Sequence, residues 1–298
     1  MTAAEWGLLI FLSLLWGGSF FFNAVAVTSL PPLTIVLSRC LIGAATLILV
    51  LRLMGKPLPF NAGSLPVFFG MGLVNNVVPQ VLIVWAQQSV PSGLASILNA
   101  TTPFFAVLCL HGLTTTDRAT PAKWLGVVVG FIGVAVLLGL DQRMAAGSVW
   151  PQIALLGASF SYGLSAWWGK KVAALGVDPI AAAAGQLSAA SLLLAPLAYG
   201  IDNPLALPLP TASVLFAVLG LALLSTALAY IVYFRILATA GPTSLSLVTL
   251  IIPVSAILLG ILFLGETFAP RHALGMAIIA SGLLIMDGRL MVWWQGRR

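Results

Sequence analysis

The sequence predicts an all-α integral membrane protein with ten transmembrane helices, arranged as two five-helix repeats of opposite orientation. The first observation is composition: of 298 residues, 60% are hydrophobic and only 7% are charged, against about 25% charged in a typical soluble domain. A soluble chain of this length would need far more charge to cover its surface. The net charge of +6 is therefore interpreted through its placement between spans, and we expect no nucleic-acid partner.

The second observation is that apolar runs near the roughly 20 residues needed to cross a bilayer recur ten times. Short connections rich in proline, glycine and asparagine separate them, and no alternation typical of barrel strands appears. The first run lacks a preceding basic residue and is too long for a cleaved signal, so we retain it as a span. The predicted spans are 6–27, 33–53, 65–87, 92–112, 122–140, 149–169, 179–200, 211–236, 243–264 and 270–288.

The third observation is an internal repeat. The stretch from Pro91 to Gly139 has the same plan as the stretch that begins at Pro242. Each copy has an interior proline, then a proline that opens the next run, then two glycines. The matched pairs are Pro103 and Pro253, Pro121 and Pro270, Gly126 and Gly275, and Gly133 and Gly282. The last three pairs are identically spaced, which indicates a true repeat. The predicted halves are 1–143 and 144–298.

The placement of lysine and arginine predicts the orientation, because these residues accumulate in cytoplasmic loops. With a cytoplasmic N-terminus, the inner segments hold Arg52, Lys56, Arg118, Lys123, Lys170, Lys171, Arg235, Arg289, Arg297 and Arg298. The outer loops then hold only Arg143 and Arg271. Both termini are therefore predicted to be cytoplasmic. Because each half has five spans, the second half is predicted to be inserted upside down, as in many secondary transporters.

Three interior prolines predict local weak points in the spans. Each proline removes a helix hydrogen bond and frees the carbonyl four residues earlier. Pro79, Pro103 and Pro253 would free the carbonyls of Asn75, Asn99 and Thr249. These prolines are either hinges beside a mid-membrane binding site or kinks whose carbonyls neighbouring helices satisfy. We favour hinges at Pro79, Pro103 and Pro253.

Several motifs resemble one family along the whole chain. They are the Trp16-Gly17-Gly18-Ser19-Phe20 sequence of the first span, Arg39 in the second, the prolines of the fourth and ninth spans, and Leu264-Gly265-Glu266. Together with the ten-span layout, they resemble the EamA branch of the drug/metabolite transporter superfamily. The resemblance is strongest to bacterial exporters of aromatic amino acids, and it implies export of amino acids and related metabolites across the inner (plasma) membrane. The first copy departs from the pattern, because Asp117 stands at the glutamate position.

The charged residues inside the spans leave one question open. Arg39 lies about six residues into its span, roughly 9 Å below the outer end by helix rise. It could bind a substrate carboxylate, or it could snorkel outward or bind free backbone carbonyls at a loop; we favour the structural role. The carboxylates and both histidines lie at or near span ends, so no proton relay is visible. This argues against proton-driven efflux of lipophilic cations and mildly favours facilitated export.

Neutral polar and aromatic residues remain to line a binding cavity. Amides and hydroxyls suit the ends of a zwitterion, and rings suit an apolar side chain; the alternative is ordinary helix packing. The predicted substrate-binding residues are Trp16, Ser19, Asn23, Asn76, Gln80, Trp85, Asn99, Thr102, Tyr162, Ser165, Trp168, Tyr230 and Thr249. Because Asn76 and Gln80 lie four residues apart, as do Ser19 and Asn23, each pair should share a helix face.

The remaining expectations concern partners and chemistry. The glycine spacings of the fifth and tenth spans predict close helix packing, with dimerisation left open, so the protein is expected as a monomer or weak homodimer. Cys40 and Cys109 lack metal or redox spacing, and we expect neither metal nor cofactor. No enzyme motif is present. The expected partners are small-molecule substrates, namely amino acids, and the lipid bilayer. We predict alternating access, with a channel-like pore or an exporter of other metabolites or drugs as alternatives.

Overall fold

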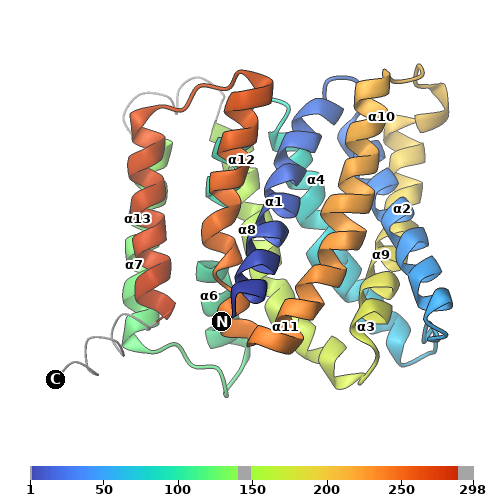
Figure 1. Cartoon of the computed structure of the whole chain (residues 1–298), viewed down its shortest axis with the longest axis horizontal. Coiled ribbons are helices and arrows are strands. Elements are labelled where there is room, and N and C mark those ends of the chain that lie inside the picture. The colour runs from blue at the N-terminus through green and yellow to red at the C-terminus, as the bar shows by residue number, and fades with distance from the viewer. Residues whose placement is uncertain (1, 140–148, 288–298) are drawn as a thin grey trace.

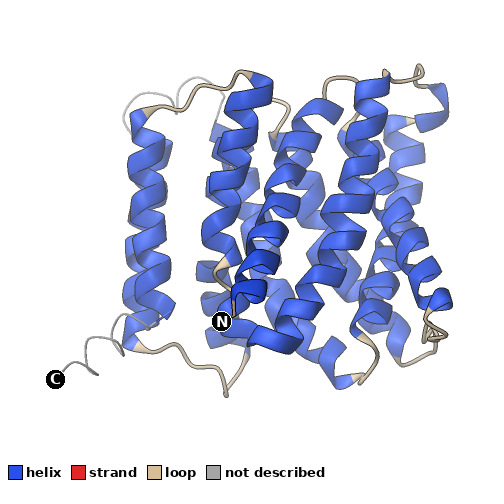
Figure 2. Cartoon of the chain, viewed as in Figure 1, coloured by secondary structure: helices blue, strands red, loops and turns tan. Residues whose placement is uncertain are grey.

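The computed structural model describes residues 2–139 and 149–287, which form a bundle of helices without any strand (Figures 1 and 2). The first half is helical because its apolar runs contain few residues that break helices. Its elements are α1 (Ala3–Ala26), α2 (Pro32–Leu53), α3 (Ser64–Gly72), the π-helical segment η1 (Leu73–Val77), α4 (Val78–Ala86), α5 (Ser92–Asn99), α6 (Thr102–Leu113) and α7 (Pro121–Leu138).

The second half has a similar but not identical order of elements. It contains α8 (Val149–Ala174), α9 (Pro179–Leu197), the π-helical η3 (Ala198–Asp202), the short 3₁₀ turn η4 (Pro204–Ala206), α10 (Ala212–Leu219), the π-helical η5 (Gly220–Leu228), α11 (Ala229–Leu245), α12 (Val248–Leu264) and α13 (Pro270–Asp287). Within α11 the chain breaks at Gly241, whose φ of 77° is not helical. The last apolar stretch before α13 therefore becomes regular only at Val248, five residues later than the predicted start of its span.

Each predicted span overlaps helix, but the structure supports fewer spans on length and hydropathy alone. Among the described residues, seven helical segments are long and apolar enough to cross a membrane, and α12 is a shorter apolar helix. The full count of ten remains a prediction. Arg143, Arg289, Arg297, Arg298 and the predicted boundary between residues 143 and 144 lie outside the described residues.

Local sequence explains where many helices begin and end. Thr2 and Glu5 form a reciprocal capping box at the start of α1, which satisfies two free backbone N–H groups. Proline occupies the first turn of α2, α7 and α9, where its missing N–H costs nothing. Gly139 and Gly265 end α7 and α12 in the left-handed conformation, which glycine adopts without strain.

The helices α7 and α13 form a closely packed antiparallel pair at one edge of the bundle (Figure 1). A Cβ atom on Gly126 would lie 2.5 Å from the carbonyl oxygen of Gly282, and one on Gly133 would lie 3.0 Å from that of Gly275. Only glycine permits backbones to approach so closely. The predicted packing role of these glycines is confirmed.

Two large apolar clusters make up the interior. The first is built mainly from α1, α5, α7, α11 and α12, and the second mainly from α2, α9 and α10 with η5. Large apolar side chains also cover the outside; Phe216, for example, is 71% exposed. A surface of this kind fits a lipid environment better than water.

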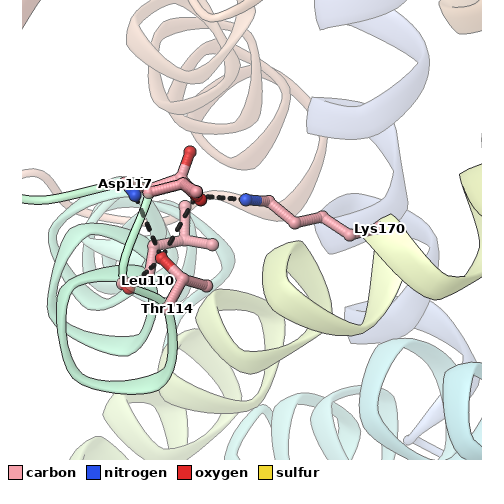
Figure 3. Close-up of polar contacts among 5 residues, drawn as sticks. Leu110, Thr114, Asp117 and Lys170 are labelled. Atoms are coloured by element: carbon pink, nitrogen blue, oxygen red, sulfur yellow. Dashed lines mark hydrogen bonds and ion pairs between the residues drawn. The ribbon is translucent and has the colours of Figure 1, made fainter.

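The two ends of the bundle hold different polar contacts. The lower end in Figure 1 contains the start of α1, the end of α13 and the connections α2–α3, α6–α7 and α8–α9. Lys56 pairs with Asp178 there at 2.5 Å, and Lys170 of α8 pairs with Asp117. Figure 3 shows that Lys170 points toward Asp117, and that the nearby Thr114 hydroxyl also donates to the Asp117 carboxylate. The hydrogen bond from Lys170 is the main reason that the pKa of Asp117 falls to about 2.

The upper end contains the connections α1–α2, α4–α5 and α12–α13 (Figure 1). Here Glu266 accepts hydrogen bonds from the backbone N–H of Ser92 at 2.7 Å, the Ser92 hydroxyl at 2.9 Å and the backbone N–H of Gly93 at 3.1 Å. Asp202 likewise accepts bonds from the backbone and hydroxyl of Thr34, at 2.7 and 3.0 Å. At this end, carboxylates of the second half thus cap α5 and α2 of the first.

Candidate functional site

A polar network lies inside the bundle, and Asn75 of η1 is its centre. The Nδ2 atom of Asn75 donates to the hydroxyl of Tyr230 at 3.1 Å and to Oε1 of Gln186 at 3.4 Å. Its Oδ1 atom accepts a hydrogen bond from Ser165 at 3.1 Å. These partners lie on α11, α9 and α8, so one side chain of the first half joins three helices of the second.

A second chain of polar contacts runs from α2 to η1. The thiol of Cys40 lies 3.9 Å from Oε1 of Gln80, and Nε2 of Gln80 donates to Oδ1 of Asn76 at 3.3 Å. The pairing of Asn76 with Gln80 follows from their four-residue spacing. Asn76 is fully buried, and its Nδ2 has no partner within the described residues. An unpaired buried donor is costly, so this amide has bonding capacity left for a ligand or a water molecule.

Arg39 lies in α2, one residue before Cys40, and is only 9% exposed. Its Nε atom donates to the hydroxyl of Thr226 at 2.8 Å, and its Nη2 atom donates to the backbone carbonyl of Ser225 at 3.3 Å. The Thr226 hydroxyl in turn donates to the carbonyl of Leu221 at 2.8 Å. Arg39 therefore does bind a backbone carbonyl, but that carbonyl belongs to η5 inside the bundle and not to a loop.

Two π-helical segments place these side chains, η1 in the first half and η5 in the second. Their backbone bonds span five residues instead of four; the N–H of Val78, for example, bonds to the carbonyl of Leu73. Such segments occur frequently at functional sites, since they widen the helix and re-aim its side chains. The segment η1 ends just before Pro79, which cannot donate to the carbonyl of Asn75.

The network lies where the two apolar clusters meet. Tyr162 packs against the first cluster, and Tyr230 packs against the second. Tyr162 is tied to the network because its carbonyl accepts a hydrogen bond of 2.7 Å from Ser165. The structure therefore brings together five of the predicted site residues, which are Asn76, Gln80, Tyr162, Ser165 and Tyr230.

The predicted residues of α1 lie in other contacts. Trp16 packs against Tyr233 with ring centroids 5.6 Å apart. The Ser19 hydroxyl bonds to the carbonyl of Trp16 in its own helix, at 2.6 Å. Asn23 donates to Gln87 at 3.1 Å, a contact that ties α1 to the end of α4. These bonds hold helices together, and none of them joins the network.

Five further predicted residues, Asn99 among them, also lie outside the network. The Thr102 hydroxyl donates to the carbonyl of Asn99 at 2.8 Å, so a side chain three residues away satisfies the carbonyl that Pro103 would free. Trp168 donates its indole N–H to the carbonyl of Val67 at 2.9 Å and thereby joins α8 to α3. The other two form no side-chain hydrogen bond to the network within the described residues: they are Trp85, which is 42% exposed, and the half-buried Thr249.

The three predicted hinge prolines have different surroundings. Pro79 lies in the first turn of α4, two residues after η1 ends, and Pro103 lies in the first turn of α6, after a turn that separates α6 from α5. Pro253 lies inside α12, which is helical throughout Val248–Leu264. The break on that side of the repeat occurs earlier, at Gly241. Their function as hinges remains a prediction.

The predicted substrate-binding residues did not include Asn75, the centre of the network, or two of its other members, Gln186 and Thr226. Gln186 is the only amide in the long apolar run of α9, Pro179–Leu197, and that isolation was a usable signal. Thr226 gave no such signal, because a threonine in a membrane helix usually bonds to its own backbone. Its importance depends on the π-helical geometry of η5.

A small recess with a volume of about 10 Å³ lies at the upper end, between α5, α12 and the start of α13. Such a volume holds about one water molecule. Among the described residues, no group of three metal-ligating side chains gathers at one place.

Comparison with known proteins assigns this chain to a class of membrane transporters. Residues 5–139 and 149–286 each match the EamA-like transporter family. Because the two matches cover most of the chain, the protein belongs to this family, and the resemblance inferred from its motifs is confirmed. It is therefore a multi-pass membrane transporter with the two-repeat organisation of the family.

Individual relatives agree with this assignment. The chain is 29% identical over 291 residues to the uncharacterized inner membrane transporter YedA of Escherichia coli, covering 94% of this chain and 89% of YedA. It is 25% identical over 300 residues to a protein of Streptantibioticus cattleyicolor named "Probable terminal-alkyne amino-acid exporter", covering 100% and 96%. A solved crystal structure at 20% identity has the same fold, with a TM-score of 0.69 over 97% of this chain and 99% of that one.

Proposed function

We propose that this protein is an alternating-access secondary transporter that exports amino acids, aromatic and other neutral ones, and related small metabolites across a bacterial inner membrane. The observation that carries the proposal is the polar network at the meeting point of the two apolar clusters. Both halves contribute to it, as a carrier requires when its halves move against each other. The relative named as an amino-acid exporter supports the substrate class.

The chemistry of the network fits a zwitterionic solute. Amide oxygens such as Oε1 of Gln186 accept hydrogen bonds from an ammonium group, and amide N–H groups such as that of Asn76 donate to a carboxylate. The rings of Tyr162 and Tyr230 offer apolar faces for the solute's side chain. In this proposal the remaining predicted residues, from Trp16 to Thr249, line the route or brace it.

The arrangement of the helices supports an inverted repeat. The pair α7 and α13 occupies equivalent places in the two halves, and the two helices run in opposite directions. Exchange of conformation between two such halves converts an opening on one side into an opening on the other. We propose that bending at Pro79, Pro103 and Pro253 accompanies this exchange, and that the lower end faces the cytoplasm.

The test is exchange of labelled phenylalanine and leucine in proteoliposomes that contain the purified protein, with and without a pH gradient. We expect saturable exchange whose rate does not depend on the pH gradient. The described acidic residues lie at helix ends and connections, where they are poorly placed to carry a proton across the membrane. Gradient-driven accumulation would contradict the uncoupled mechanism. Ion currents faster than a carrier allows would identify a channel, and absence of exchange for every amino acid would refute the substrate class.

A further inference from the structure

We propose that Arg39 binds the carboxylate of the transported solute, so that the protein selects solutes carrying an anionic group. This inference rests on the proposed function and deepens it, since it names the bound end of the solute and the residue that binds it. Four observations carry it: the depth of the guanidinium, its lack of a counter-ion, its unused donors and its neighbours.

The guanidinium lies deep in the bundle. Its partner Thr226 is near the middle of the apolar helical segment Ala212–Gly241. Arg39 itself lies seven residues after Pro32, the first residue of α2, or roughly 10 Å from the upper end by helix rise. The side chain therefore extends toward the middle of the bundle, whereas an arginine that snorkels extends toward the nearer interface.

The charge of Arg39 is not neutralised by any described carboxylate. The two ion pairs of the described residues involve Lys56 and Lys170 at the lower end. The acceptors of Arg39 are a neutral hydroxyl and a neutral carbonyl. A buried cation without a counter-ion is costly in a membrane interior. An anionic ligand would remove that cost.

The guanidinium also has donors to spare. It carries five N–H groups, and its bonds to Thr226 and Ser225 use two of them. Those two bonds fix its orientation against η5, which leaves a planar fork of the kind that binds a carboxylate through two parallel hydrogen bonds. Arg39 thus combines a positioned cation with free bonding capacity.

The surroundings place this fork beside the polar network. Arg39 belongs to α2, the helix from which the contacts of Cys40, Gln80 and Asn76 begin. Its neighbour Cys40 leads through Gln80 to Asn76, whose Nδ2 lacks a partner. A carboxylate on Arg39 would therefore leave the ammonium group and the side chain of an amino acid among the amides and rings of the network.

The test is competition against labelled phenylalanine exchange by three compounds: phenylalanine, its amide, which lacks the carboxylate, and 3-phenylpropionate, which lacks the amine. For the native protein we expect the amide to compete at least about 10-fold more weakly than phenylalanine, since hydrogen bonds to charged groups are the stronger ones. If phenylalanine amide competed as well as phenylalanine itself, the inference would be overturned without any variant.

Variants separate binding from bracing. The preference is the ratio of competition by phenylalanine to competition by its amide. In Arg39→Gln this ratio should fall to about 1, and Arg39→Lys should retain part of it because the charge remains. Thr226→Val removes a brace but keeps the cation, so it should lower the rate and keep the preference. The exposed Arg235→Gln is the matched control and should change neither. A preference that survives in Arg39→Gln would contradict the inference.

A second readout covers variants that do not transport. Thermal unfolding of purified native protein and Arg39→Gln would be compared with and without 3-phenylpropionate and its amide. We expect 3-phenylpropionate to stabilise the native protein, whereas its amide should not. Neither compound should stabilise Arg39→Gln. If the native protein exchanges no amino acid, the proposed function fails; the inference on Arg39 then fails as well only if no carboxylate stabilises the native protein more than its amide does.

Discussion

The two ends of the bundle use the same kind of side chain in different ways. Glu266 and Asp117 occupy equivalent positions, four residues before Pro270 and Pro121. At the upper end Glu266 accepts three hydrogen bonds from the start of α5, whereas at the lower end Asp117 pairs with Lys170 of α8. Both contacts join one half to the other, but only the upper one satisfies buried backbone groups.

The difference has an energetic consequence. A carboxylate at a helix start satisfies N–H groups that otherwise lack partners and also interacts favourably with the helix dipole. A partly exposed lysine–aspartate pair contributes only about 0–1 kcal/mol and is screened by salt. The upper end is therefore held more firmly by its polar contacts than the lower end, and the following experiments test that contrast.

The largest effect is expected for Glu266→Ala. This change removes three hydrogen bonds and leaves the N–H groups of Ser92 and Gly93 without their acceptor. From the size of helix-cap and dipole effects, the free energy of unfolding should fall by about 2 kcal/mol. Unfolding in mixed detergent micelles measures it. Glu266→Gln keeps one acceptor oxygen and should lose less, and native-like stability of Glu266→Ala would contradict the contrast.

A smaller loss is expected for Asp202→Ala, because Asp202 accepts two bonds, both from Thr34. The expected decrease is about 1 kcal/mol, in the range of a single helix cap. The same unfolding measurement applies. Thr34→Ser keeps the hydroxyl and should change stability little; a Thr34→Ser loss as large as that of Asp202→Ala would show that packing of the methyl group dominates instead.

The pH dependence of the lower pair gives a third test. The folded-state pKa of Asp117 is about 2, below its ordinary value of 3.8, chiefly because of Lys170. A lowered carboxyl pKa contributes stability that is present above the unfolded pKa and is lost as pH falls through the folded pKa. The difference in melting temperature between native protein and Lys170→Ala should thus stay constant from pH 7 to 5 and shrink between about pH 4 and 2.

Asp117→Asn is the control for that titration. With no carboxylate to titrate, adding Lys170→Ala to it should change the melting temperature little at any pH. A double-mutant comparison at pH 7 isolates the interaction between the two side chains. A pH-independent effect of Lys170→Ala would mean that the lysine stabilises through its hydrocarbon stem.

The smallest effect is expected for Lys56→Ala, which breaks the pair with Asp178 at a cost below about 1 kcal/mol. Partial burial alone would raise the pKa of Asp178, but the hydrogen bonds from Lys56 and from the backbone of Ile180 lower it. In about 1 M salt, where the screening length is about 3 Å, the effect of Lys56→Ala should disappear. The effect of Glu266→Ala should persist, and equal salt sensitivity would contradict the contrast.

Much of the fold follows from the sequence, because in a membrane apolar length and periodic breaks dictate helices. The repeat located α7 and α13 and their contact glycines. The start of α12 was not foreseen: Pro242 suggested a helix start, but the positive φ of Gly241 and the turn after Leu245 delay the regular helix to Val248.

The site was less predictable. The four-residue spacing located the pair Asn76 and Gln80, and Pro79 pointed to the weak segment that became η1. Nothing comparable precedes η5, whose sequence Gly220–Leu228 contains no proline. The direction of Arg39 depends on that segment, so spacing alone could not show that its guanidinium extends inward. Contacts such as Asn75 with Gln186 join distant parts of the chain and arise only from packing.

The close approach of α7 and α13 has a consequence for how such a chain could arise. Gly126 contacts Gly282, and Gly133 contacts Gly275, while by the repeat Gly126 corresponds to Gly275 and Gly133 to Gly282. Each glycine therefore meets the counterpart of the other one, as in an isologous interface of two identical subunits. A helix with this spacing is complementary to an antiparallel copy of itself. Joining both copies in one chain fixes their stoichiometry and lets each side of that once-symmetric contact change independently.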